Sequence, residues 1–307
     1  MSARERRELV EASSGAPAPY AHMQLGGPFN PYPGLPVVLV RTIIFSGGEC
    51  HVKVKDWRPY DGLRGVVVSS RLATGTDIMQ LMLCIDALGH LGVPAGSVHV
   101  VLPYIPYARQ DRVCDAGESF SLRVFSKLLN SLGLGKVTMV DAHSDVAPAL
   151  IDNSVNVSNC AYVRQALEDI GGTDVLIVSP DSGANKKVHK LVKDLGTGNT
   201  VIACDKERDP ATGALSGFQV FADDLGGRDC LIVDDICDGG RTFIGVATEL
   251  RKKNAGDIYL FVTHGIFSAG FTDLSIIFKK VYCTDSFSTV SNELVKQFPI
   301  NLELAND

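Results

Sequence analysis

The sequence predicts an α/β protein with two domains, each built on a mainly parallel sheet that is flanked by helices. Three observations predict this class. Short apolar runs rich in β-branched residues alternate with amphipathic stretches, polar turn-forming residues follow the apolar runs, and the alternation passes through the chain about twice. The 307 residues, of which 45% are hydrophobic, are enough for two ordinary domains.

The individual elements follow from this alternation. Compact apolar runs are expected to form strands at 35–40, 65–69, 98–102, 136–140, 175–179, 201–203, 231–233 and 258–262. Apolar residues at helical spacing, several of them following Asp, Ser or Thr as N-caps, predict helices at 77–91, 121–132, 185–195 and 242–254.

The domain limits are predicted from composition. Residues 1–35 are rich in Pro, Gly and charge without apolar periodicity, which favours a loosely ordered N-terminal arm. The segment 151–159 has few bulky side chains and is typical of a connection between domains. We therefore expect an N-terminal domain at 36–160 and a C-terminal domain at 161–307; a return of the last residues to the N-terminal domain stays open.

Charge and cysteine usage exclude several classes of protein. The formal net charge of -6 and a pI near 5.7 leave no basic field for nucleic acid or an anionic membrane. The N-terminus has no apolar export segment, and no apolar run approaches a membrane span. The eight cysteines include no C-x-x-C pair, so they are interpreted as reduced thiols of a cytoplasmic protein.

The strongest motif is the segment 231–242, in which an apolar strand runs into Asp-Asp-Ile-Cys-Asp-Gly-Gly-Arg-Thr before a helix. Gly239 and Gly240 allow backbone amides to turn inward and bind one phosphate at the helix start. The adjacent Asp234 and Asp235 would repel each other unless a metal or sugar hydroxyls lay beside them. The pattern predicts a site for a phosphorylated sugar; an ordinary turn with solvated acids is the alternative.

Two further motifs follow strands in the first half of the chain. In the segment 103–112, Arg109 would hold a polyphosphate that Gln110 orients, whereas a solvated basic turn is the alternative. In the segment 139–145, His143 is flanked by two acids and could ligate a metal carried by nucleotide phosphates. A structural histidine is the other interpretation.

Two segments in the second half carry less specific signals. The segment 177–187 puts Asp181 and the amides around Gly183 at a strand end before a helix, where an N-cap and turn are the alternative. The polar segment 205–213 could close over a substrate, although a mobile surface loop has the same composition.

In this order the motifs resemble the ribose-phosphate pyrophosphokinase family (PRPP synthetases), from about Phe45 to the C-terminus. The resemblance rests on Pro-Tyr-Ala-Arg-Gln-Asp, Asp-x-His, Ser-Pro-Asp-x-Gly, Lys-Glu-Arg, Val-Asp-Asp-x-x-Asp and Thr-His-Gly-Ile-Phe-Ser at 263–268. It implies two phosphoribosyltransferase-like domains with the active site between them. It also implies transfer of the β,γ-pyrophosphoryl group of ATP to the 1-hydroxyl of ribose 5-phosphate, giving PRPP and AMP.

The resemblance further implies Mg²⁺ as the cofactor and a homo-oligomer in which a neighbouring subunit completes the ATP site. Carried over residue by residue, it implies two catalytic residues, Lys206 and Arg208, and two metal ligands, His143 and Asp181. The implied ATP-binding residues are Phe45, Glu49, Arg109 and Gln110. The implied ribose 5-phosphate residues are Asp234, Asp235, Asp238, Gly239, Gly240, Arg241 and Thr242.

The sequence departs from the family pattern in several places. The opening strand and helix of the family are not visible in residues 1–44, Gly47 stands where an asparagine is usual, and Arg241 stands where a glycine is common. The segment 113–117, Val-Cys-Asp-Ala-Gly, lacks the lysines of phosphate-activated members, so we expect no activation by phosphate. A non-catalytic regulatory homologue and a PRPP-consuming phosphoribosyltransferase are the competing functions.

Overall fold

The computed structural model describes residues 20–27, 29–59, 62–171, 174–208 and 215–303, without the side chains of residues 207, 208, 215 and 216. The chain divides into two compact units. The first unit runs to Val157 and resumes at Ile300, and the second unit is Ser158–Pro299.

The first unit contains a six-stranded sheet in which every neighbouring pair is parallel, in the order β2-β1-β5-β6-β7-β8. Its strands are β1 (Tyr20–Leu25), β2 (Val37–Val38), β5 (Gly65–Ser70), β6 (Val98–Val101), β7 (Lys136–Val140) and β8 (Ser154–Val157). A separate antiparallel hairpin is formed by β3 (Val40–Ile44) and β4 (Cys50–Val54).

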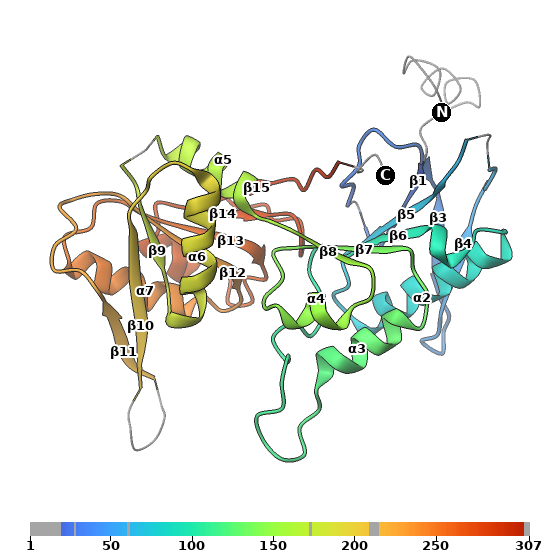
Figure 1. Ribbon diagram of the computed structural model, residues 1–307, viewed down its shortest axis with the longest axis horizontal. Coiled ribbons are helices and arrows are strands. Elements are labelled where there is room, and N and C mark those ends of the chain that lie inside the picture. The colour runs from blue at the N-terminus through green and yellow to red at the C-terminus, as the bar shows by residue number, and fades with distance from the viewer. Residues whose placement is uncertain (1–19, 28, 60–61, 172–173, 209–214, 304–307) are drawn as a thin grey trace. The chain divides into compact units, whose positions relative to one another are not determined.

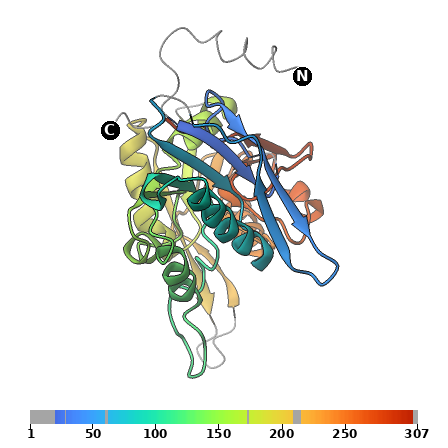
Figure 2. The ribbon, with the colours of Figure 1, turned by 90° about the vertical axis from the view of Figure 1, so that its right-hand side faces the viewer.

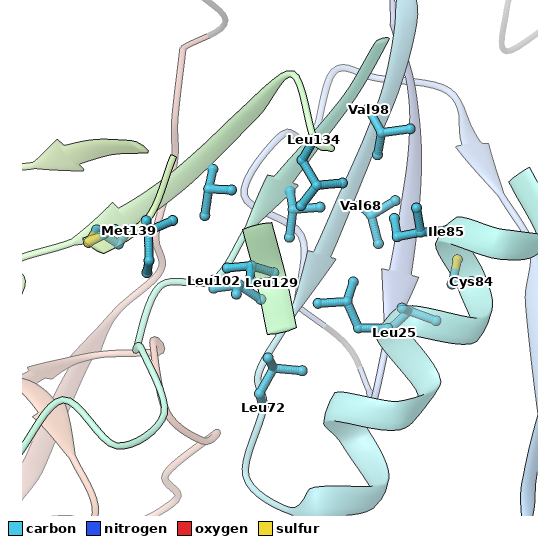
Figure 3. Packing of buried hydrophobic residues seen from close by; sticks show 14 of the residues in the cluster. Leu25, Val68, Leu72, Cys84, Ile85, Val98, Leu102, Leu129, Leu134 and Met139 are labelled. Atoms are coloured by element: carbon cyan, nitrogen blue, oxygen red, sulfur yellow. The ribbon is translucent and has the colours of Figure 1, made fainter. Parts of the chain in front are cut away.

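One face of this sheet carries the hydrophobic core of the unit. On this face the sheet packs against α2 (Gly75–His90), α3 (Ser121–Asn130) and the short α4 (Val146–Leu150). A 3₁₀ turn, η1 (Ala95–Ser97), precedes β6. Figure 3 shows Cys84 and Ile85 of α2 next to Val68 of the sheet. The side chain of Thr74 accepts from the Asp77 N–H, and the Asp77 carboxylate accepts from the Thr74 N–H, so α2 begins with a complete capping box.

The opposite face of the same sheet is also buried and carries polar side chains beside valines. His22 Nε2 lies 2.7 Å from Ser69 Oγ, and His99 Nε2 lies 2.7 Å from Thr138 Oγ1. The ring of Tyr32 lies edge-on to both imidazoles. Burial lowers the pKa of His22 to about 4, so this histidine is neutral in the folded protein.

The second unit contains a seven-stranded sheet in the order β11-β10-β9-β12-β13-β14-β15, parallel except for β11 at one edge. Its strands are β9 (Leu176–Ser179), β10 (Val201–Arg208), β11 (Leu215–Val220), β12 (Cys230–Cys237), β13 (Ile258–Gly265), β14 (Lys280–Thr284) and β15 (Val295–Phe298). The central strands are buried on both faces, which is why they read as continuous apolar runs.

Helices cover both faces of this second sheet. The core on one face includes the apolar side of α7 (Arg241–Lys252) and Leu274 of α8 (Thr272–Ile277). On the other side of the strands lie α5 (Cys160–Ile170) and α6 (Ser182–Leu195), as Figures 1 and 2 show. The α/β class with mainly parallel sheets is thereby confirmed for the described residues.

The structure adds detail to three local predictions or differs from them. Residues 20–25 are not part of a loose arm, because β1 pairs with both β2 and β5 and Met23 is fully buried; residues 1–19 lie outside the described chain. The division between the units falls between Val157 and Ser158, inside the connection predicted at 151–159, but this segment also contains the edge strand β8, whose short, half-exposed run was not predicted as a strand. Residues 205–208 continue β10 and pair with β11, whereas residues 209–214 lie outside the described residues.

Candidate active site

The second sheet has a topological switch point beside β9. The chain leaves β9 for β10 on one side and later returns as β12 on the other side. Ligands of open parallel sheets bind beyond the carboxyl ends of the strands at such a point. Asp181 directly follows β9, Lys206 lies on β10, and the Asp234–Asp235 pair lies on β12, so three predicted motifs converge on this edge.

Asp181 makes two contacts that use different carboxylate oxygens. Its Oδ1 accepts from the Ala184 N–H at 3.0 Å, which makes it the N-cap of α6, and its Oδ2 lies 2.6 Å from Lys206 Nζ. The N-cap interpretation is therefore correct for this residue, and a charged partner is present in addition. Arg208 ends β10, and its side chain lies outside the described residues.

The acid pair on β12 is largely withdrawn from solvent. Asp235 is 6% exposed, and its backbone N–H donates to Asp234 Oδ1 at 2.9 Å. Burial, followed by the charge of Asp235 and a smaller contribution from Asp181, raises the pKa of Asp234 well above its ordinary value. Lys187 Nζ lies 4.0 Å from Asp235 Oδ2. Such a pair favours a ligand that brings hydroxyl groups or a cation.

The loop after β12 presents the start of α7. Gly240 is the N-cap of this helix with φ +80°, and α7 has no side-chain cap, in contrast to α2. A Cβ at Gly240 would lie 3.0 Å from Leu274 Cδ2, so both the backbone angle and the space favour glycine. Thr242 is half-buried and Arg241 is exposed. An uncapped helix start that follows a glycine pair can bind a phosphate.

In the first unit, the predicted motifs at 103–112 and 139–145 contact each other at the carboxyl ends of β6 and β7. Ser144 Oγ donates to Asp111 Oδ2 at 2.8 Å, and Arg112 Nε donates to Asp111 Oδ1 at 3.1 Å. Burial acts to raise the pKa of Asp111, but the hydrogen bonds from Ser144 and Arg112 and the charges of Arg112 and His143 hold it below its usual value. The segment that bears Arg109 is therefore fixed to the segment that bears His143.

Sequence reasoning missed Asp111 and Ser144 as members of this site. Both lie inside the quoted motifs, so the signal was present, but their contact spans 33 positions of the chain. Arg109 and Gln110 are exposed, and His143 is half-buried. The two exposed side chains are in a position to bind a ligand from solvent.

Phe45 and Glu49 lie at the tip of the separate β3–β4 hairpin. The Phe45 N–H donates to the Glu49 carbonyl at 2.8 Å, which closes the turn. The Phe45 ring is 51% exposed although it is a large apolar group. An exposed ring at a hairpin tip is available for stacking on a base or on another chain.

Two negative findings concern the described residues. They contain no group of three or more His, Cys, Asp or Glu that could hold a metal ion. No helix in the described part of the chain has both the length and the apolar character that a membrane span needs.

Two family models match the chain. Residues 160–273 match the phosphoribosyl transferase domain, which defines the class of the second unit, and residues 21–133 match the N-terminal domain of ribose phosphate pyrophosphokinase. The ribose-phosphate pyrophosphokinase of Vibrio vulnificus is 32% identical over 260 residues, which cover 81% of this chain and 79% of the relative. That of Vibrio parahaemolyticus is 30% identical over 252 residues, covering 80% and 77%. The chain belongs to the ribose-phosphate pyrophosphokinase family.

The fold agrees with that of a solved structure. The phosphoribosylpyrophosphate synthetase of Mycobacterium smegmatis superposes with a TM-score of 0.75, covering 92% of this chain and 94% of that one at 23% identity. The family models and the relatives confirm the family predicted from the motifs, and the solved structure agrees with it in fold.

Proposed function

We propose that this protein is a ribose-phosphate diphosphokinase, which transfers the β,γ-pyrophosphoryl group of ATP to the 1-hydroxyl of ribose 5-phosphate. The observation that carries the proposal is the end of β12 and the loop after it, where a largely buried acid pair on the strand is followed by an uncapped helix start. Residues 238–242 form what we call the phosphate cradle. It would bind the 5-phosphate through the amides of Gly239, Gly240 and Arg241 and the hydroxyl of Thr242. Asp234 and Asp235 would accept hydrogen bonds from the ribose hydroxyls.

The first unit supplies the ATP half of the proposed site. Arg109 can pair with phosphate oxygens, and Gln110 can orient them. The exposed ring of Phe45, with Glu49 beside it, is suited to the adenine of ATP bound by a neighbouring copy of the chain. The proposal therefore includes a homo-oligomer with a shared ATP site.

In the transfer step, the oxygen of the sugar 1-hydroxyl forms a bond to the β-phosphorus of ATP and its proton is released to water. The bond from that phosphorus to the α,β-bridging oxygen breaks, and AMP leaves with this oxygen. Lys206 and Arg208 would neutralise charge that develops on the transferring group. His143 and Asp181 would hold Mg²⁺, which when bound screens the charge of the phosphate oxygens. Lys206 then needs to leave Asp181 for the transferring group.

Two finer statements belong to the same proposal. The acidic, lysine-free segment 113–117 offers no cation for a regulatory anion, so phosphate should not activate the enzyme. A cytoplasmic setting is supported by the cysteines, all eight of which are free.

The test is to incubate the protein with ribose 5-phosphate, ATP and Mg²⁺ and to follow AMP and PRPP by chromatography, with and without phosphate. Equal amounts of AMP and PRPP without phosphate support the proposal. Severalfold saturable activation by phosphate would overturn the regulatory part. No product in either buffer would instead favour a regulatory homologue that binds active subunits, and PRPP consumption with a nucleobase would favour a phosphoribosyltransferase.

A further inference from the structure

The segment 263–268, Thr-His-Gly-Ile-Phe-Ser, has no role in the proposed chemistry, yet it lies directly against the phosphate cradle. Its first three residues are the end of β13, the strand that pairs with β12, and its last three residues follow that strand. The backbone N–H groups of Ile266 and Phe267 both donate to the Cys237 carbonyl, at 2.9 and 3.1 Å. This segment is therefore fixed to the last residue of β12, immediately before the cradle.

Ser268 holds the next residue of the cradle through two hydrogen bonds. Its backbone N–H donates to the Asp238 carbonyl at 3.1 Å, and its Oγ donates to Asp238 Oδ1 at 2.5 Å. A carboxylate cannot donate a hydrogen bond to a phosphate, and its charge repels one. The carboxylate of Asp238 must therefore be held away from the bound phosphate, and the hydrogen bond from Ser268 holds it.

The conformation that presents Ser268 is an unusual one. Phe267 has φ +52°, in the left-handed region that residues with a side chain seldom adopt. Its ring packs 5.0 Å from that of Phe271, and a Cβ at Gly265 would come within 2.2 Å of it. Backbone strain of this kind persists where the surrounding structure enforces it, and such positions cluster at functional sites.

We propose that Ser268 is a positioning residue for the sugar-phosphate cradle and acts through the carboxylate of Asp238. Its hydroxyl anchors Asp238, which fixes the path of the chain through Gly239 and Gly240 so that their amides converge on the phosphate. The inference rests on the proposed role of this loop in binding the 5-phosphate. Because Ser268 is exposed, its removal leaves the core intact.

The test compares Ser268→Ala, Ser268→Thr and a control, Ser275→Ala. The control removes another exposed serine of the same unit, whose Oγ donates to the Thr272 carbonyl at 2.7 Å. Ser268→Ala is expected to raise the Kd and KM for ribose 5-phosphate about tenfold or more, the effect of losing a hydrogen bond to a charged group. The kcat, the KM for ATP and the melting temperature stay close to wild type, and Ser268→Thr restores binding.

A double-mutant comparison tests the route. If Ser268 acts through Asp238, Ser268→Ala has no further effect on the Kd in an Asp238→Ala background. Calorimetric titration with ribose 5-phosphate separates the outcomes. Wild-type protein that binds the sugar while Ser268→Ala binds it equally well overturns this inference alone, as does an additive double mutant. Wild-type protein that does not bind the sugar overturns the proposed function and, with it, this inference.

Discussion

Replacing Lys206 with alanine removes an ammonium group that lies 2.6 Å from Asp181 Oδ2 at the switch point of the second sheet. If this cation stabilises the transferring pyrophosphoryl group, its loss should lower kcat about a hundred- to a thousandfold, the range for one lost electrostatic contact in a transition state. The same change breaks an ion pair whose side chains are 28% and 23% exposed. A partly exposed pair contributes about 1 kcal/mol or less to stability, so the variant should remain folded.

The assay measures AMP and PRPP formed at saturating ATP and ribose 5-phosphate, together with the melting temperature. Lys190→Ala is the matched control, because Lys190 also pairs with an aspartate of the same unit, Asp194, at 3.6 Å but is 76% exposed on α6. We expect the control to retain wild-type turnover. A loss of kcat below about tenfold in Lys206→Ala would refute the assignment, since an ordinary surface cation predicts no more.

Three further predictions concern stability and binding. Gly240→Ala places a Cβ 3.0 Å from Leu274 Cδ2 on a residue with φ +80°. We expect this change to lower the unfolding free energy by about 1–2 kcal/mol, measured by denaturation. We also expect weaker binding of ribose 5-phosphate, measured by titration. The folded chain holds the Asp234 proton more tightly than the unfolded chain does, so the unfolding free energy falls as pH rises above the carboxylate's ordinary pKa of 3.8. Asp234→Asn should therefore melt higher than wild type at neutral pH while losing sugar binding; a lower melting temperature would contradict this. His22 has a pKa lowered by burial from 6.5 to about 4, so unfolding free energy falls as pH drops through that window, and His22→Gln should flatten the dependence in thermal melts.

The sequence predicts most central strands because strands that are buried on both faces need apolar residues at nearly every position. Strands such as β6, β9 and β13 are buried at every position and consist mostly of apolar residues. Edge strands lack this signal, and the edge strands β8, β11 and β15 are absent from the prediction. The interior strand β14 was missed as well, because it begins with a lysine and is only five residues long. β1 is well buried but lies between proline- and glycine-rich stretches, whose composition concealed it.

The candidate site was predictable where its residues are consecutive and unpredictable where they meet through strand order. The acid pair on β12 and the glycines that follow this strand form one motif, so their proximity needs no tertiary information. The contacts of Lys206 with Asp181 and of Ser268 with Asp238 span 25 and 30 positions. They follow from β10 lying beside β9 and β13 beside β12, which residue spacing alone does not specify.

The return of the chain to its first unit has a consequence for synthesis on the ribosome. The Leu302 N–H donates to the Pro31 carbonyl at 2.8 Å, so the first unit is complete only after the whole of Ser158–Pro299 has been translated. The second unit is one uninterrupted stretch and can fold as soon as it has left the ribosome. The first unit begins earlier in the chain but is completed only when the C-terminal residues have been synthesised. A stop codon after Pro299 would accordingly weaken the first unit and leave the second unit intact.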